Sequence, residues 1–211
     1  MKQQEKTQRT RERILAAAVV EFGTKSYEAA SINAICARSG VPKGLLYYHF
    51  PSKDALYLYC AKTCYDQMTR YLKARRIDAQ DVQGSLEKLL EIRQTFFAEH
   101  PDYANIFFHT VLQPPRHLLE ELRAIREEFN AFYTQCYRGM LEHLSLREGI
   151  TLDMALEYFS IFTDAFNQYF QGKAREEADY GQLIADHEGK LSVMLDIMLY
   201  GIVQDKMQES R

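Results

Sequence analysis

Apolar side chains recur along this chain every three or four positions, the spacing that gathers them on one face of an α-helix. The first such stretch predicts a helix from Thr7 to Phe22, and Gly23 is placed to end it. Its apolar face consists of five side chains, Ile14, Leu15, Ala18, Val19 and Phe22. The same spacing predicts later helices near residues 52–76, 82–99, 102–112, 115–145, 151–174 and 182–207. The pattern therefore indicates an all-α protein.

Two short helices are predicted between the first helix and the long one that begins after Ser52. Ser31 is positioned as an N-cap, because its hydroxyl oxygen can accept a backbone N–H of the first turn. Gly40 breaks this helix and can adopt the positive φ of a tight turn. Pro42 fits the first position of the next helix, which runs to about His49. Two short helices joined by a glycine-containing turn describe a helix-turn-helix, whose second helix enters the major groove of DNA.

The second of these helices carries side chains suited to DNA on its outward face. Lys43 can meet a phosphate or a guanine edge, and Gly44 lets the backbone approach DNA closely. The side chains of Tyr47, Tyr48 and His49 can donate hydrogen bonds to phosphate oxygens. The alternative for the two tyrosines is that they are core aromatics. Five apolar side chains and a small one are expected to hold the motif together, Ile32, Ile35, Cys36, Val41, Leu46 and Phe50.

Charge is unevenly distributed along the chain, whose net charge is −3. Residues 1–54 hold nine Lys and Arg and five Asp and Glu, a net of +4, which leaves −7 for the remainder. A basic first quarter on an acidic body is typical of a localised polyanion-binding module, although chance asymmetry is the alternative. Lys53 and the free N–H groups after Ser52 would add an anion site at the start of the long helix.

Composition excludes several other classes of protein. The 46% of apolar residues suffice for a sizeable core. The longest apolar run near the start, Ile14–Val20, is far shorter than the roughly 20 residues of a membrane span, and it does not fit a secretory signal either. We therefore expect a soluble, cytoplasmic protein that does not bind a membrane.

No catalytic or metal-binding motif stands out. The chain has no P-loop, HExxH, nucleophile elbow or GxGxxG, so we expect no enzyme and no cofactor. The cluster Asp186, His187 and Glu188 is explained equally well by a polar helix start. Cys60 and Cys64 could form half of a metal site or a redox pair, but without a further His/Cys cluster we expect reduced, packed thiols and no metal.

The stretch from Ser31 to Leu56, SINAICARSGVPKGLLYYHFPSKDAL, resembles the DNA-binding signature of the TetR family of bacterial repressors, and the residues before it resemble that family's first helix. The resemblance covers about a quarter of the chain. It implies a three-helix DNA-binding domain with the helix-turn-helix over residues 1–52, followed by a six-helix ligand-binding and dimerisation domain over residues 53–211. It assigns DNA contacts to seven residues, Ser31, Lys43, Gly44, Tyr47, Tyr48, His49 and Lys53.

Three positions depart from the family's usual residues. Pro42 stands where Ser or Ala is commoner, so a hydroxyl that caps the helix or meets a phosphate is missing. Leu45 stands where Thr is frequent, and we predict that it contacts DNA through a thymine methyl group. Cys36 replaces the usual Ala and remains small enough to pack.

A helix-turn-helix dimer binds two half-sites, so a dimerisation surface is expected. The resemblance implies that the last two helices pair with those of a second copy. The predicted interface consists of Leu152, Ala155, Phe159, Leu191, Met194, Leu195, Met198 and Ile202. The alternative is that these apolar stripes pack inside one subunit.

The middle helices resemble the family's ligand-binding core and are rich in aromatic residues. Such residues can line a pocket for a flat or apolar effector, although each could equally belong to the core. The predicted pocket residues are Phe96, Tyr103, Phe107, His109, Phe129, Tyr133, Phe162 and Phe166. The resemblance thus predicts a homodimeric repressor of a palindromic operator, released when an unknown small-molecule effector shifts the population of DNA-fitting dimers. A helical protein–protein adaptor and an effector-independent regulator, including an activator, remain alternatives.

Overall fold

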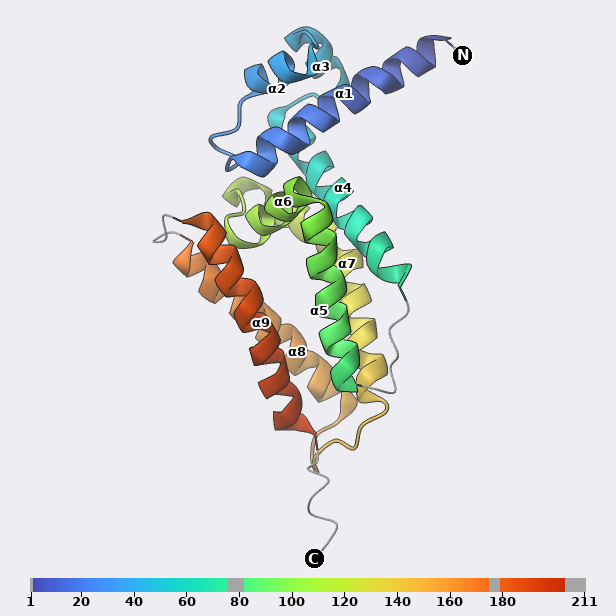
Figure 1. The fold of residues 1–211 in the computed structure, drawn as a ribbon, viewed down its shortest axis with the longest axis vertical. Helices are drawn as coiled ribbons and strands as arrows, with labels where there is room; N and C mark the ends of the chain where they lie inside the picture. The colour runs from blue at the N-terminus through green and yellow to red at the C-terminus, as the bar shows by residue number, and fades with distance from the viewer. Residues whose placement is uncertain (1, 76–81, 175–178, 204–211) are drawn as a thin grey trace, which may run out of the picture. The chain divides into compact units, whose positions relative to one another are not determined.

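The computed structural model describes residues 2–75, 82–174 and 179–203 (Figure 1). Within these ranges it contains nine α-helices and one 3-10 helix, with no strand, which confirms the expected all-α fold. The elements are α1 (Lys2–Thr24), α2 (Ile32–Ser39), α3 (Lys43–His49), α4 (Lys53–Lys73), α5 (Val82–Glu99), α6 (Pro101–Leu112), η1 (Arg116–Leu118), α7 (Leu119–Leu141), α8 (Leu152–Lys173) and α9 (Tyr180–Ile202).

The chain forms two compact units that do not follow its linear order. The first comprises Met1–Arg70 and Thr95–Glu127, and the second comprises Tyr71–Gln94 and Glu128–Arg211. Helices α4, α5 and α7 each contribute residues to both units. The units are defined by packing, whereas the predicted boundary after residue 52 divides the chain by role, and that boundary stays a prediction.

Helix α1 is the central element of the first unit, where it packs against α2 and α6. It continues past the predicted end at Gly23 and stops at Thr24. Gly23 is buried, and a Cβ atom there would lie 2.9 Å from the backbone oxygen of Asp102 in α6. Glycine at this position therefore permits the close approach of α6 rather than terminating the helix.

Most of the predicted helix boundaries agree with the structure to within a few residues. Gly40 is the C-cap of α2 and has the positive φ, 63°, that was predicted for the turn. The predicted helix 115–145 differs, because a 3-10 turn follows Pro115 and α7 begins only at Leu119 and ends at Leu141. Helix α4 ends at Lys73 and α9 at Ile202, both earlier than predicted; the predicted ends, Arg76 and residue 207, lie outside the described residues.

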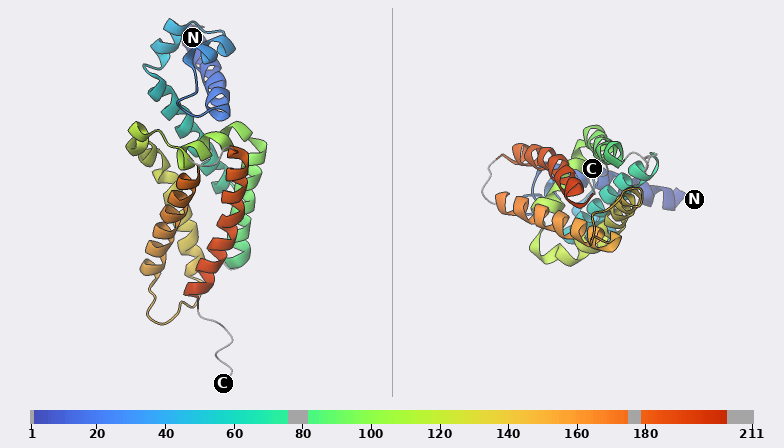
Figure 2. Two further views of the ribbon diagram at one scale, coloured as in Figure 1. Left: turned by 90° about the vertical axis from the view of Figure 1, so that its left-hand side faces the viewer. Right: turned by 90° about the horizontal axis from the view of Figure 1, so that it is seen from below.

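Side chains cap the two helices that close the second unit. The Thr151 hydroxyl accepts the N–H of Met154 at 3.2 Å at the start of α8, and the Asp179 carboxylate accepts the N–H of Gln182 at 3.1 Å at the start of α9. Helices α8 and α9 lie side by side (Figure 2). No described helix combines the length and the apolarity that crossing a membrane requires.

A buried polar network joins the helices of the second unit. Arg93 of α5 donates from Nη2 to both carboxylate oxygens of Glu188 in α9, each at 2.7 Å. His187 lies 3.1 Å from Glu188 through Nδ1 and 3.2 Å from the Asn167 side-chain oxygen through Nε2. Burial alone would raise the pKa of Glu188, but the adjacent Arg93 guanidinium outweighs it and the pKa is lowered. The cluster Asp186–Glu188 thus includes a structural ion pair.

Candidate nucleic-acid interface

The helix-turn-helix is held together by the apolar residues expected to do so. Ile35 and Leu46 are completely buried, and Val41 and Phe50 are nearly so. Phe50 also packs its ring 5.6 Å from that of Tyr59 in α4. Because these contacts fix α3 on α2 and α4, the side chains on the opposite face of α3 are held in place by a rigid support.

The exposed face of α3 contains the side chains predicted to contact DNA. Tyr48 is 79% exposed and Tyr47 is 39% exposed, which disfavours the alternative that both are core aromatics. Leu45 is exposed as well, and no atom lies within 4 Å of a Cβ built on Gly44. His49 is half-buried, with its ring 5.4 Å from that of Tyr48.

A cation lies at the beginning of this exposed face. Lys43, the first residue of α3, is exposed, and its Nζ lies 6.0 Å from the centre of the Tyr47 ring one turn later. The ammonium group and the tyrosine hydroxyl therefore belong to one small surface. Such a pair supplies several hydrogen-bond donors for phosphate oxygens or for the acceptors of a guanine.

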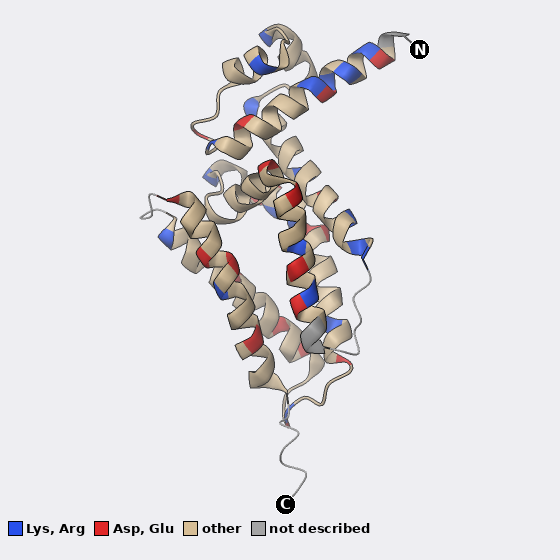
Figure 3. Cartoon of the chain, in the orientation of Figure 1, with Lys and Arg blue, Asp and Glu red and all other residues tan. Residues whose placement is uncertain are grey.

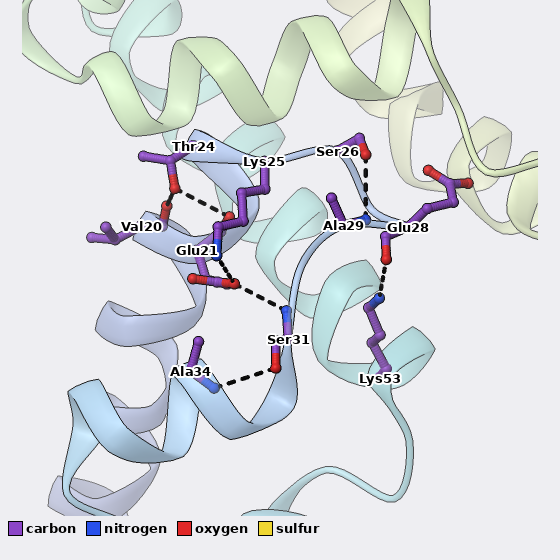
Figure 4. Close-up of polar contacts among 10 residues, drawn as sticks. All are labelled: Val20, Glu21, Thr24, Lys25, Ser26, Glu28, Ala29, Ser31, Ala34 and Lys53. Carbon is purple, nitrogen blue, oxygen red and sulfur yellow. Dashed lines mark hydrogen bonds and ion pairs between the residues drawn. The ribbon is translucent and has the colours of Figure 1, made fainter.

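Ser31 is fixed by a buried carboxylate that sequence reasoning missed (Figure 4). Its backbone N–H donates to Glu21 Oε1 at 3.0 Å, and the same oxygen accepts from Lys25 Nζ at 2.8 Å. Burial would raise the pKa of Glu21, but the hydrogen bonds from Lys25 and Ser31 prevail and lower it. The Ser31 hydroxyl accepts from the N–H of Ala34 at 3.5 Å, as predicted for an N-cap. The sequence did contain a signal for this buried carboxylate: Glu21 stands among apolar residues, and Lys25 follows four positions later.

Lys53 is half-buried, and its ammonium group contacts the loop before α2. The Nζ atom donates to the backbone oxygen of Glu28 at 3.4 Å (Figure 4). The same atom lies 4.4 Å from the centre of the Tyr27 ring. An ammonium group carries three donors. The structure thus places Lys53 beside the helix-turn-helix, with its phosphate contact still a prediction.

A second cluster that sequence reasoning missed lies behind this loop. The Tyr27 hydroxyl donates to Asp54 Oδ1, and His117 Nε2 of η1 lies 3.4 Å from the same oxygen. The pKa of Asp54 is lowered, mainly by the hydrogen bond from Tyr27, while burial opposes the shift. Burial and the same hydrogen bond raise the pKa of Tyr27. The cluster joins the loop before α2, the first turn of α4 and η1 within one unit.

The predicted pocket residues are divided between the two units. Phe96, Tyr103, Phe107 and His109 belong to the first unit, and Phe129, Tyr133, Phe162 and Phe166 to the second. His109 is buried among apolar side chains, which lowers its pKa to about 4. The neutral imidazole therefore fits the core alternative. The pocket that these eight residues were expected to form stays a prediction.

A small cavity lies in the second unit, with a volume of about 20 Å³. This volume holds about one water molecule. The residues around it are Leu86, Leu89, Leu90, Tyr133, Tyr137, Met140, Phe159 and Leu195. Only Tyr133 of the predicted pocket residues is among them, and half of the lining consists of leucines, which a search for aromatics overlooks.

The predicted dimer residues lie mostly on the inner faces of α8 and α9. Five of them are buried within the protomer, Ala155, Leu191, Leu195, Met198 and Ile202, while Leu152 and Phe159 are half-buried. Met194 is the exposed exception. A second, exposed apolar stripe that sequence reasoning missed consists of Met154, Tyr158, Ile161 and Tyr169 on α8 and Val193, Ile197 and Tyr200 on α9. The predicted stripe is thus largely buried within the protomer, and its part in a dimer interface stays a prediction.

Two of the four cysteines lie close together on α4. Cys60 and Cys64 are free and buried, and burial raises the pKa of both thiols. In the part of the chain that the structure describes, no group of three or more His, Cys, Asp and Glu side chains could hold a metal.

Comparison with known proteins gives matches to two family models. Residues 14–60 match the model of bacterial regulatory proteins of the tetR family, and residues 80–202 match that of the tetracyclin repressor-like C-terminal domain. The repressor NicS of Pseudomonas putida is 26% identical over 122 residues, which cover 57% of this chain and 58% of NicS. The regulator LmrA of Bacillus subtilis is 37% identical over 89 residues, 38% of this chain and 45% of LmrA. The chain thus spans about half the length of these curated relatives.

Solved structures resemble nearly the whole chain in fold. SmeT, the repressor of the Stenotrophomonas maltophilia multidrug efflux pump SmeDEF, superposes with a TM-score of 0.64 at 22% identity, covering 95% of this chain and 93% of SmeT. NalD, the secondary repressor of the MexAB-OprM pump in Pseudomonas aeruginosa, gives a TM-score of 0.57 at 23% identity, covering 95% and 99%. At these identities the likeness concerns the fold.

Proposed function

Because this DNA-binding transcription regulator belongs to the TetR family, we propose that it is a homodimeric repressor that binds a palindromic operator and is released by a small-molecule effector. The observation that carries the proposal is the exposed face of α3, where Lys43, Tyr47 and Tyr48 stand on a buried apolar support. A surface of donors on a firmly packed helix is what major-groove recognition requires.

Individual roles follow from the positions on α3 and its neighbours. Lys43, at the helix start, contacts a guanine edge or a phosphate, while Tyr47 and Tyr48 donate to phosphates. The exposed Leu45 contacts a thymine methyl group, so the operator has an A·T pair at that position. Ser31 and His49 add phosphate contacts at the two edges of the motif.

Dimerisation is supported by the exposed apolar stripe on α8 and α9. Ile161 and Ile197 are 59% and 60% exposed, and Met154, Tyr158 and Tyr200 extend the same faces. Large apolar side chains that recur on the exposed face of a helix favour an interaction surface, because their contact with water is unfavourable. We assign the interface to these outer positions together with Met194, instead of the buried stripe first predicted.

Release by an effector is supported by the match to the family's C-terminal domain. The apolar cavity in the second unit has a volume of only about 20 Å³. A ligand pocket usually encloses about 300–1,000 Å³, far more than this cavity. Binding must therefore enlarge it, and the energy of that change would couple the effector to the DNA-binding conformation.

Selection from a pool of random duplexes tests the DNA-binding proposal directly. The purified chain should enrich a palindrome whose half-sites are one helical turn, or a multiple of it, apart. Sedimentation of the complex should show two protomers on each duplex. An enriched sequence without two-fold symmetry, or no enrichment at all, would contradict the proposal.

A further inference from the structure

A stripe of basic side chains runs along the first half of α1. Lys6, Arg9 and Arg13 are spaced by three and four residues, so they fall within an arc of about 60° on the helix. The acidic side chains of this segment, Glu5 and Glu12, fall outside that arc. Lys and Arg positions accordingly gather on the N-terminal half of α1 (Figure 3).

No described residue neutralises the charges of the first two cations in this stripe. Lys6 and Arg9 are exposed, and their side-chain nitrogen atoms form no ion pair or hydrogen bond with any described residue. Arg11 lies on another face of the helix and already has a partner within the protein, because its guanidinium lies 4.6 Å from the centre of the Tyr59 ring. Lys6 and Arg9 are therefore available to an external anion.

The stripe is continuous with the turn of the helix-turn-helix. Arg13 donates from Nη2 to the backbone oxygen of Ser39 at 2.5 Å, at the end of α2. A Cβ atom on Gly40, the next residue, would lie only 2.8 Å from the same nitrogen. Arg13 thus connects the stripe to the turn that precedes Lys43 and α3. From there Lys6 lies seven residues back along α1, a distance of about 10 Å.

We propose that Lys6 and Arg9 bind backbone phosphates of duplex DNA that flank the site reached by α3. The proposal rests on the proposed DNA-binding function and extends its contact surface along α1. The contact adds affinity and salt dependence without sequence preference, because phosphates carry no base information. An anionic membrane surface fits less well, since residues 4–13 contain no large apolar side chain that could enter a bilayer.

Salt dependence of DNA binding distinguishes this contact from a general charge effect. Each phosphate neutralised contributes about 0.9 to the slope of log affinity against log salt concentration. We therefore expect the double variant Lys6→Gln/Arg9→Gln to lose about 1.8 from the slope per protomer. The measurement is fluorescence anisotropy of a labelled, mixed-sequence duplex of roughly 40 base pairs over the range of about 50–200 mM salt.

Two further variants control for charge and for position. Arg116→Gln/Arg123→Gln removes two exposed cations of η1 and α7 in the same unit and should retain the slope of the parent. Lys6→Arg/Arg9→Lys keeps both charges and should also retain it. A slope unchanged by Lys6→Gln/Arg9→Gln, or lowered as much by the control, would overturn the α1 contact.

Failure of the DNA-binding proposal itself gives a different result. In that case the parent chain shows no salt-dependent binding to the duplex, or Lys43→Ala binds as tightly as the parent. If the parent binds and Lys43→Ala weakens it, the helix-turn-helix is active. The salt dependence of the Lys6→Gln/Arg9→Gln variant then shows whether α1 contacts the DNA.

Discussion

The exposed face of α3 and the exposed stripe of α8 and α9 are both proposed to bind another molecule, and they are built from opposite kinds of side chain. On α3 the exposed side chains include an ammonium group and two phenols, supported by fully buried Ile35 and Leu46. On α8 and α9 the exposed side chains are mostly apolar, with Ile161 and Ile197 more than half exposed. A polar, cationic surface on a rigid support favours binding of a polyanion, whereas an exposed apolar face favours packing against a second apolar face.

The difference teaches that exposure, not apolarity, separates a binding surface from a core. Both helices of the second surface carry two apolar stripes, and only one of each pair is buried. On α9 the stripe through Leu191 and Leu195 is inward, and the stripe through Val193 and Ile197 is outward. Variants that change DNA binding, dimerisation or stability one at a time therefore test whether the two surfaces have these separate roles.

The largest effect is expected on the polar surface. Lys43→Ala/Tyr47→Ala removes an ammonium group and a phenol that both face outward from α3, and we expect more than about 100-fold weaker binding to the selected palindrome. Both side chains are exposed, so thermal stability and the dimer should not change. Anisotropy with the selected duplex measures the first effect and sedimentation the second. Retained affinity would show that α3 is not the recognition helix.

The apolar surface is tested by comparing an outer with an inner residue of α9. Ile197→Glu places a charge on the exposed stripe, and we expect mostly monomer at micromolar concentration. The folding stability of the monomer itself should change by no more than about 0.5 kcal/mol. Leu195→Ala removes buried methyl groups and should cost about 2–5 kcal/mol of stability. Analytical ultracentrifugation and urea unfolding give the two readouts. A stable Ile197→Glu dimer would exclude this stripe from the interface.

The helix-turn-helix could be predicted residue by residue because its signature combines local rules. Ser31 as a cap, Gly40 as a positive-φ turn and Leu46 as an anchor depend on neighbours a few positions away. The inner and outer stripes of α8 and α9 could not be told apart, because each has helical spacing and only tertiary packing decides which is buried. The cavity was missed for the same reason, since composition does not show where packing is incomplete.

Long-range contacts explain the remaining differences from expectation. Asp54 pairs with Tyr27 and with His117, which lies 63 positions later in the chain, and no local pattern indicates such a cluster. Gly23 had the position of a helix terminator, and its contact with Asp102 depends on how α6 is placed.

A moderate effect is expected where α1 and α6 approach each other. Gly23→Ala introduces a Cβ atom 2.9 Å from the Asp102 backbone oxygen, so backbone must shift, and we expect a loss of about 1–3 kcal/mol. Gly139→Ala in α7 is the matched control, because nothing lies within 4 Å of its added Cβ. There the higher helix propensity of alanine should stabilise by up to about 1 kcal/mol. Equal effects of the two substitutions would contradict the close approach.

The smallest effect concerns the carboxylate behind the DNA-binding surface. The pKa of Asp54 is lowered in the folded state, so its contribution to stability is present above the unfolded value of about 4 and is lost as pH falls through the folded pKa. Asp54→Asn should lower stability at neutral pH by no more than about 1 kcal/mol, because the carboxylate is partly exposed to solvent. Urea unfolding between pH 7 and pH 3 measures both chains. The difference between their stabilities should shrink as the pH falls below about 4. A constant difference across this range would show that the charge of Asp54 does not stabilise the cluster.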